Sequence, residues 1–91
     1  MYDLILSDKA AEDLQYFKHH NILCYKKALS LLKELIEHPY TGTGKPERLK
    51  YELSGSWSRR INAEHRIVYT VLEDVIEVHV LAMRHHYRRW N

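Results

Sequence analysis

Side chains that can move protons or hold an anion gather in the second half of this 91-residue chain. They form three groups, each of which mixes fixed cations with a carboxylate or histidines. The groups are Lys45, Glu47, Arg48 and Lys50; Arg59, Arg60, Glu64, His65 and Arg66; and the run 84–90, which reads Arg-His-His-Tyr-Arg-Arg-Trp. Such charges often serve only to keep an exposed sheet face soluble, but solubility needs no mixture of acid, base and cation.

The mixture matches what cleavage of an RNA phosphodiester needs when side chains alone supply the chemistry. A base takes the proton of the ribose 2′-hydroxyl, cations stabilise the dianionic phosphorane, and an acid protonates the departing 5′-oxygen. We predict Glu47 as the base and His86 as the acid. Arg66, with Lys50 and Arg60, would form the cationic clamp. An unperturbed imidazole has a pKa of about 6.5, so a histidine is partly protonated at neutral pH.

Other kinds of site find little support in the sequence. His19-His20 and His85-His86 are adjacent pairs, whose side chains diverge on a helix or strand. The chain also lacks His-x₃-His and Cys-x₂-Cys spacings, so we predict no metal or cofactor site. Cys24 is the single cysteine, which excludes an internal disulfide, and its helical surroundings indicate a packed thiol rather than a nucleophile.

The totals predict one small domain over residues 1–91. Lys and Arg number 14 against 12 Asp and Glu, and this formal charge of +2 does not by itself indicate nucleic-acid binding. A core of this size leaves little margin, so a partner or self-association would help stability. The sequence shows neither a signal peptide nor the ~20 apolar residues of a membrane span. We therefore expect a cytoplasmic protein with no membrane contact.

The first half of the chain predicts a strand and two helices. Residues 2–6 are short and apolar, and Ser7 can cap a helix that turns its apolar residues to the core and its charged ones, Asp13 included, elsewhere. Asn21 interrupts this helix and can cap a second one. The second helix ends at His38-Pro39, because a residue before proline is pushed out of the helical region.

Beyond a glycine-rich loop at 41–46 the apolar period falls to two, which predicts strands. Four are expected: 49–53, 57–61, 66–72 and 75–82. The order β-α-α-β-β-β-β predicts an α+β fold with two helices packed on one face of an antiparallel sheet. Alternation then places Lys50 and Arg66 on the uncovered face, and a sheet face with basic residues and nearby aromatics suits RNA.

Three segments carry a resemblance to a known family. The first reads Thr-Gly-Lys-Pro-Glu-Arg-Leu-Lys at 43–50 and continues Leu-Ser-Gly-Ser-Trp-Ser-Arg-Arg-Ile at 53–61. Glu-His-Arg-Ile-Val-Tyr follows at 64–69, and His-Tyr stands at 86–87. Together they resemble the conserved centre of the YoeB/Txe toxins, in the RelE/ParE superfamily of type II toxin–antitoxin systems. The resemblance covers nearly the whole chain in length and element order and is densest from 42 to 69.

This resemblance implies a RelE-like fold, ribosome-dependent cleavage of messenger RNA in the A site, and neutralisation by a co-expressed antitoxin of the YefM/Axe kind. By position, Glu47 resembles the family's general base, Arg66 its transition-state arginine and His86 its general acid. Tyr87 resembles the aromatic residue that orients the substrate.

The resemblance also implies accessory residues and partners. Lys50, Arg60 and His65 match accessory positions, and Lys45 and Arg59 join them as candidates for RNA contact. Members of the family often form homodimers. A toxin–antitoxin complex commonly binds its own operator DNA, and the antitoxin makes most of that contact.

Two features depart from the family pattern. Toxins of this group usually stop at His-Tyr, whereas here Arg-Arg-Trp-Asn follows at 88–91, and His85 doubles the candidate acid. We choose His86 because it directly precedes the tyrosine. Two non-catalytic alternatives stay open: a module that binds RNA or the ribosome, and a relative that acts with its partner only on transcription.

Overall fold

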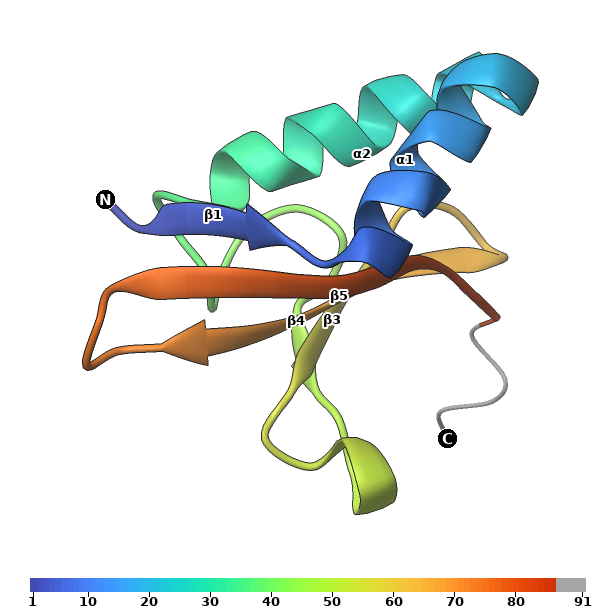
Figure 1. The fold of residues 1–91 in the computed structure, drawn as a ribbon. Helices are drawn as coiled ribbons and strands as arrows, with labels where there is room; N and C mark the ends of the chain where they lie inside the picture. Colours follow the sequence, from blue (N-terminus) through green and yellow to red (C-terminus); the bar gives the residue numbers. More distant parts are fainter. Residues whose placement is uncertain (87–91) are drawn as a thin grey trace.

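The structure is a computed structural model that describes residues 1–86, and side chains up to Arg84. Its elements are β1 (Asp3–Leu6), α1 (Asp8–His20), α2 (Ile22–Leu35), β2 (Glu47–Arg48), a 3₁₀ turn η1 (Tyr51–Leu53), β3 (Trp57–Arg60), β4 (His65–Leu72) and β5 (Glu77–His86). Both helices lie on the same side of the sheet (Figure 1), which confirms the predicted α+β arrangement. Within residues 1–86 neither helix has the length and apolar run needed to cross a bilayer.

The sheet has the strand order β1-β5-β4-β3-β2 and is mixed. Strands β5 to β2 pair antiparallel, but β1 runs parallel to β5, with Leu4 opposite Val78. The prediction of a wholly antiparallel sheet is therefore wrong for this pair. Apolar alternation records which face a strand buries and not the direction of its neighbour, so the pattern left this direction undetermined.

The local signals at the helix starts are confirmed, whereas α2 ends at Leu35, before the predicted end at His38-Pro39. Ser7 Oγ accepts the Ala10 N–H at 3.0 Å, and Asn21 Oδ1 accepts the Cys24 N–H at 3.2 Å, so each helix starts at its predicted cap. The main core lies between the helices and the sheet. It includes Phe17, Leu31, Leu35, Ile67, Tyr69, Val80 and Met83, each at most 1% exposed.

Asp13 was predicted to point away from the core, and this is wrong. Its side chain is buried, with the residue only 1% exposed. The carboxylate is compensated by Lys9 one turn earlier in α1 and by backbone N–H groups of β5, and no pattern within the helix could have indicated the β5 contacts.

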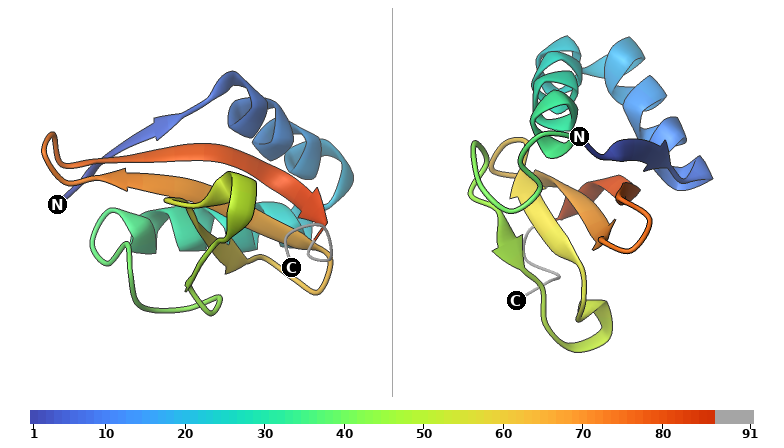
Figure 2. Two further views of the ribbon diagram at one scale, coloured as in Figure 1. Left: turned by 90° about the horizontal axis from the view of Figure 1, so that it is seen from below. Right: turned by 90° about the vertical axis from the view of Figure 1, so that its left-hand side faces the viewer.

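The predicted strand at 49–53 is also wrong. Pairing stops at Arg48, Tyr51 has a φ of 60°, and residues 51–53 form the η1 turn. The turn packs Leu49 and Leu53 against Val68 in a second, small apolar cluster. Because Val68 alternates with two residues of the main core, this cluster lies on the sheet face opposite the helices, which is therefore partly covered. The right view of Figure 2 shows the β2–β3 hairpin projecting away from the helices.

Strand β5 is irregular before its end. Val80 opposes Tyr69 and His85 opposes Arg66, so five steps along β5 match three along β4. Extra residues of this kind bend a strand and increase its twist, and β5 curves visibly in the left view of Figure 2. The bend carries the last residues of β5 along the end of β4 at which Arg66 lies.

Candidate active site

Glu47 and Arg66 meet on the sheet face opposite the helices. Glu47 opposes Ser58 across the β2–β3 pair, and Arg66 reaches both from β4. Arg66 Nη2 lies 2.5 Å from Glu47 Oε1, and Nη1 donates to Ser58 Oγ at 3.1 Å. The Arg66 side chain is fully buried, whereas that of Glu47 is 45% exposed. Solvent therefore reaches the carboxylate of the pair but not the guanidinium behind it.

Strand β5 brings the predicted acid to the same end of the sheet. In the backbone register His85 stands opposite Arg66 and His86 opposite His65. The side chains of both histidines lie outside the described part of the structure, as does Tyr87. The roles of His86 and Tyr87 therefore stay predictions.

The other predicted residues lie near this end of the sheet but differ in their exposure to solvent and in the sheet face they occupy. Arg60 opposes Arg66 in the β3–β4 pair, and directly paired residues of an antiparallel sheet share a face. The His65 ring packs on Phe17 with 5.3 Å between centroids, and its side chain is 15% exposed. Lys45 is exposed and is separated from β2 by Pro46, with a φ of 50°.

Lys50 and Arg66 were expected together on an uncovered sheet face. This is wrong for Lys50, and for Arg66 the face is right but the exposure is wrong. Lys50 is exposed, but it precedes η1 outside any strand, so strand alternation does not govern its direction. Arg66 is on the expected face but completely buried, with its guanidinium bound to Glu47 and Ser58.

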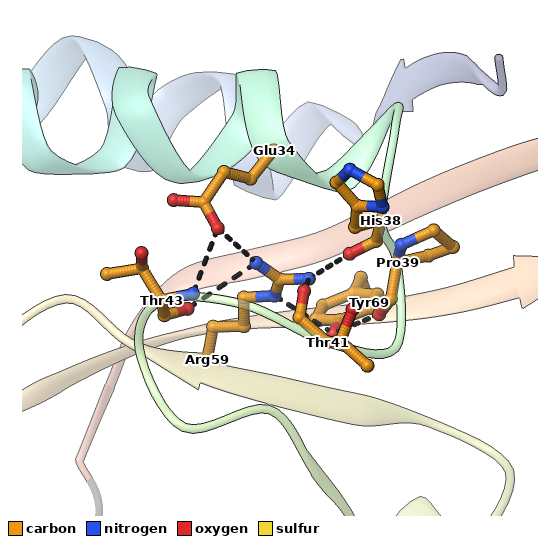
Figure 3. Close-up of polar contacts among 7 residues, drawn as sticks. All are labelled: Glu34, His38, Pro39, Thr41, Thr43, Arg59 and Tyr69. Atoms are coloured by element: carbon orange, nitrogen blue, oxygen red, sulfur yellow. Dashed lines mark hydrogen bonds and ion pairs between the residues drawn. The ribbon is translucent and has the colours of Figure 1, made fainter.

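Arg59 points the opposite way, toward α2 and the loop that follows it (Figure 3). It is 0% exposed, so its side chain offers no surface for the predicted RNA contact. Its guanidinium instead contacts Glu34 Oε1 at 3.2 Å, the carbonyls of Thr41 at 2.7 Å and Thr43 at 3.4 Å, the His38 carbonyl and the Tyr69 hydroxyl at 3.3 Å. Arg59 therefore fastens the loop between α2 and β2, which leads directly to Glu47.

Glu34 completes this buried anchor from α2. Its Oε1 accepts the Thr43 N–H at 2.9 Å. Hydrogen bonds from Thr43, together with the Arg59 charge, hold the pKa of the Glu34 carboxyl below its ordinary value. The carboxylate thus stays ionised beside a permanent cation, and the loop is tied to both the helix layer and the sheet.

Gly44 shows how closely the loop approaches β3. Its carbonyl accepts the Arg60 N–H at 2.7 Å, and its φ is 87°. A Cβ at this position would lie 2.9 Å from the Arg60 carbonyl oxygen, so a side chain does not fit without displacing backbone. This contact fixes the chain only three residues before Glu47.

Sequence reasoning missed Ser58, Glu34 and Asp13. Ser58 carried a usable signal, because it alternates with Arg60 along β3 and therefore shares its face. The positions of Glu34 and Asp13 depend on loop and strand backbone far along the chain. Among the described side chains, no group of three His, Cys, Asp or Glu residues lies close enough to hold a metal ion.

Residues 6–87 match a family model described as a YoeB-like toxin of bacterial type II toxin–antitoxin systems. The toxin YoeB of Escherichia coli strain K12 is 43% identical over 84 residues, which cover 92% of this chain and 98% of that protein. Among solved structures, a YoeB dimer from Staphylococcus aureus is 39% identical with a TM-score of 0.83, covering 94% of this chain and 98% of that one. A YoeB–YefM complex from the same organism is 40% identical with a TM-score of 0.81, covering 96% and 99%.

Proposed function

This chain belongs to the YoeB-like toxins of bacterial type II toxin–antitoxin systems, and from that premise we propose that it is an endoribonuclease. It cuts messenger RNA on the ribosome and so stops translation, without using a metal ion. The observation that supports this best is the ion pair of Glu47 and Arg66, in which a solvent-open carboxylate stands against a buried guanidinium.

In the proposed reaction Glu47 takes the proton of a ribose 2′-hydroxyl. The 2′-oxygen attacks the adjacent phosphorus, and Arg66 stabilises the extra negative charge of the phosphorane. The bond to the 5′-oxygen of the next nucleotide then breaks, and His86 supplies a proton to that oxygen. The products are a 2′,3′-cyclic phosphate and a free 5′-hydroxyl.

The Glu47–Arg66 pair explains how one carboxylate can be both stable and reactive. Without RNA, Arg66 neutralises Glu47 across 2.5 Å. A bound phosphodiester gives Arg66 a second anion, which draws the guanidinium away from the carboxylate. Arg66 can then bind the phosphate, while the Glu47 carboxylate is free to accept the proton of the 2′-hydroxyl.

The cations around this pair would hold the RNA backbone. Lys45 and Lys50 are exposed and flank Glu47 in the chain, and Arg60 shares the sheet face of Arg66. Such residues contribute affinity through phosphate neutralisation. We place His65 beside the acid, and Tyr87 as the residue that orients the substrate. Arg59 is not part of the proposed site.

The proposed partners are the ribosome with its messenger RNA, and an antitoxin of the YefM kind. A homodimer is proposed as well, since a related toxin forms one in its solved structure. Operator DNA would be bound only as a toxin–antitoxin complex. The place of action is the cytoplasm, where ribosomes and messages meet, and no membrane contact is proposed.

The decisive experiment uses ribosomes carrying a short message whose cleaved nucleotide is either ribose or 2′-deoxyribose. We expect cuts inside translated codons with the ribose message, 5′-hydroxyl ends on the downstream fragment, and no cut with the deoxy message. Cleavage of the deoxy message, or 5′-phosphate ends, would overturn the mechanism. Growth arrest that persists in both E47Q and H86A would favour the non-catalytic binding module instead.

A further inference from the structure

Asp13 is a buried carboxylate that reaches from α1 to β5. Its Oδ2 accepts the N–H groups of Met83 at 2.9 Å and Arg84 at 3.1 Å, while Oδ1 accepts from Lys9 Nζ at 2.6 Å. Burial alone would raise the pKa of Asp13, but Lys9 and the two backbone N–H groups outweigh it and hold the pKa below its ordinary value. The proposed reaction does not use this group.

The two N–H groups that Asp13 binds mark a bulge in β5. In a regular strand successive N–H groups point to opposite edges, whereas Met83 and Arg84 both donate to one oxygen. The register shows the same irregularity, because three steps from Ala82 to His85 match two from Val68 to Arg66. Asp13 therefore binds β5 at the point where an extra residue enters the strand.

The start of α1 holds the residues just before this bulge. Ser7 N–H donates to the Val80 carbonyl at 3.0 Å, and Ser7 Oγ donates to the Leu81 carbonyl at 2.8 Å. β1 ends opposite Val80, so in the described chain the outer edge of β5 beyond that residue is held by α1 rather than by a strand. The helix thus replaces a missing strand neighbour along 80–84.

Histidines 85 and 86 follow this segment directly. A one-residue slip in a strand moves every later side chain to the other face of the sheet. A first extra residue enters between Val80 and Ala82, so the bulge at Met83–Arg84 is the second and last irregularity before the histidines. Its placement decides that His85, and not His86, stands opposite Arg66, and that His86 stands opposite His65.

We propose that Asp13 is a positioning residue that fixes the bulge at Met83–Arg84 and thereby sets the register of the two terminal histidines. For catalysis this rests on the proposed function, in which one of the two histidines, His86 by the family pattern and His85 as the alternative, is the acid. The register itself is a property of the fold and can be tested with no RNA present.

The structural test compares wild type with D13A by nuclear magnetic resonance. We expect that D13A loses the slow hydrogen exchange of the Met83 and Arg84 amides and the cross-strand contact between the backbones of His65 and His86. The nearby exposed carboxylate gives a matched control, E12A, which should leave both signals unchanged. An unaltered His65–His86 contact in D13A would overturn the proposal.

The catalytic test measures kcat and KM for ribosome-bound message at a temperature where each variant is folded. A mispositioned acid lowers kcat, so D13A should lose about 10²-fold in kcat with KM within threefold. D13N keeps an oxygen that can accept both N–H groups, and it should recover most of that loss. Equal kcat in D13A and wild type, or no recovery in D13N, would refute the positioning role.

Two outcomes that could obscure the test are covered by design. If D13A does not fold, D13S is examined in its place, with the same expected losses, because the serine hydroxyl is polar but too short to reach the Met83 and Arg84 N–H groups. If wild type itself cleaves no message, the proposed function fails, while the exchange and cross-strand measurements still decide the role of Asp13 in the register.

Discussion

Glu47 and Arg66 form an ion pair of 2.5 Å in which the guanidinium is fully buried and the carboxylate is 45% exposed. The two residues come from β2 and β4, with β3 between them. The pair therefore exists only once three strands have assembled, and it joins the stability of the sheet to the proposed chemistry.

Replacing Glu47 should separate these two roles. E47Q retains a hydrogen-bond acceptor for Arg66 but not the base, so we expect cleavage to fall by about 10²–10⁴-fold with nearly unchanged stability. E47A also leaves the buried guanidinium without its carboxylate, which should cost about 1 kcal/mol more because half of the pair is exposed. Urea unfolding and cleavage assays on both variants check this, and full activity in either would contradict Glu47 as the base.

The proposed acid can be tested through its leaving group. H86A should lose about 10²–10⁴-fold in kcat, and H85A much less. In a substrate with sulfur in place of the bridging 5′-oxygen, the leaving group is a thiolate that needs no proton. This substrate should therefore restore cleavage by H86A but not by E47Q. If the sulfur substrate fails to rescue H86A while wild type still cuts it, His86 is not the acid.

Arg59 should prove to be a structural residue. R59K keeps the charge but cannot reach all the carbonyls that the guanidinium contacts, so we expect a loss of about 2 kcal/mol in the free energy of unfolding. R48K, at a solvent-exposed position on β2, is the matched control and should change stability little. Ribosome affinity of folded R59K should equal that of wild type. A fall in affinity at unchanged stability would restore the RNA contact first predicted for Arg59.

The loop before Glu47 offers a pair of glycines for comparison. G44A places a Cβ 2.9 Å from the Arg60 carbonyl oxygen, whereas a Cβ at Gly55 meets nothing within 4 Å. Both positions have positive φ, so both substitutions strain the backbone, by about 1 kcal/mol each. G44A should cost at least about 1 kcal/mol more than G55A in thermal unfolding, because it also displaces the loop. Equal costs would mean that the loop adjusts freely.

Asp13 should make the fold sensitive to acid. Its folded-state pKa is lowered, so its contribution to stability is complete above the unfolded value of about 3.9 and is lost as pH falls through the folded value. The free energy of unfolding of wild type, measured by urea titration, should therefore fall more steeply below pH ~4 than that of D13N, which has no charge at this position to titrate. Parallel curves for the two proteins between pH 5 and pH 2 would contradict this.

Much of the fold follows from local signals, and the failures share a physical cause. Ser7 and Asn21 cap helices through contacts three residues away, so their roles are visible in the sequence. Asp13 and Arg59 are buried charges, which residue type alone predicts at the surface. The β5 partners of Asp13 lie 70 and 71 residues away along the chain, and the partners of Arg59 lie 10 to 25 residues away. The alternation at 49–53 was real, but a 3₁₀ turn rather than a strand produced its apolar contacts.

The candidate site was predictable in its chemistry and less so in its geometry. A carboxylate, cations and a terminal histidine could be chosen by residue type, and Glu47 and Arg66 do converge. Arg66 is buried and contacts Ser58 because of the strand order. Arg59 lies on the helix side of the sheet, away from Arg66, because it binds the loop after α2. Those features arise from tertiary packing, which no single segment encodes.

The parallel pairing of β1 with β5 joins the two ends of the chain, since Asp3 stands opposite Glu77. Synthesis proceeds from the amino end, so β1 waits without its strand partner until β5 has emerged. The Glu47–Arg66 pair needs only β2, β3 and β4, but the sheet is complete only when β5 joins β1 to β4. In the proposed function, a nascent copy therefore lacks the predicted acid His86, which lies on β5, until that strand has been made.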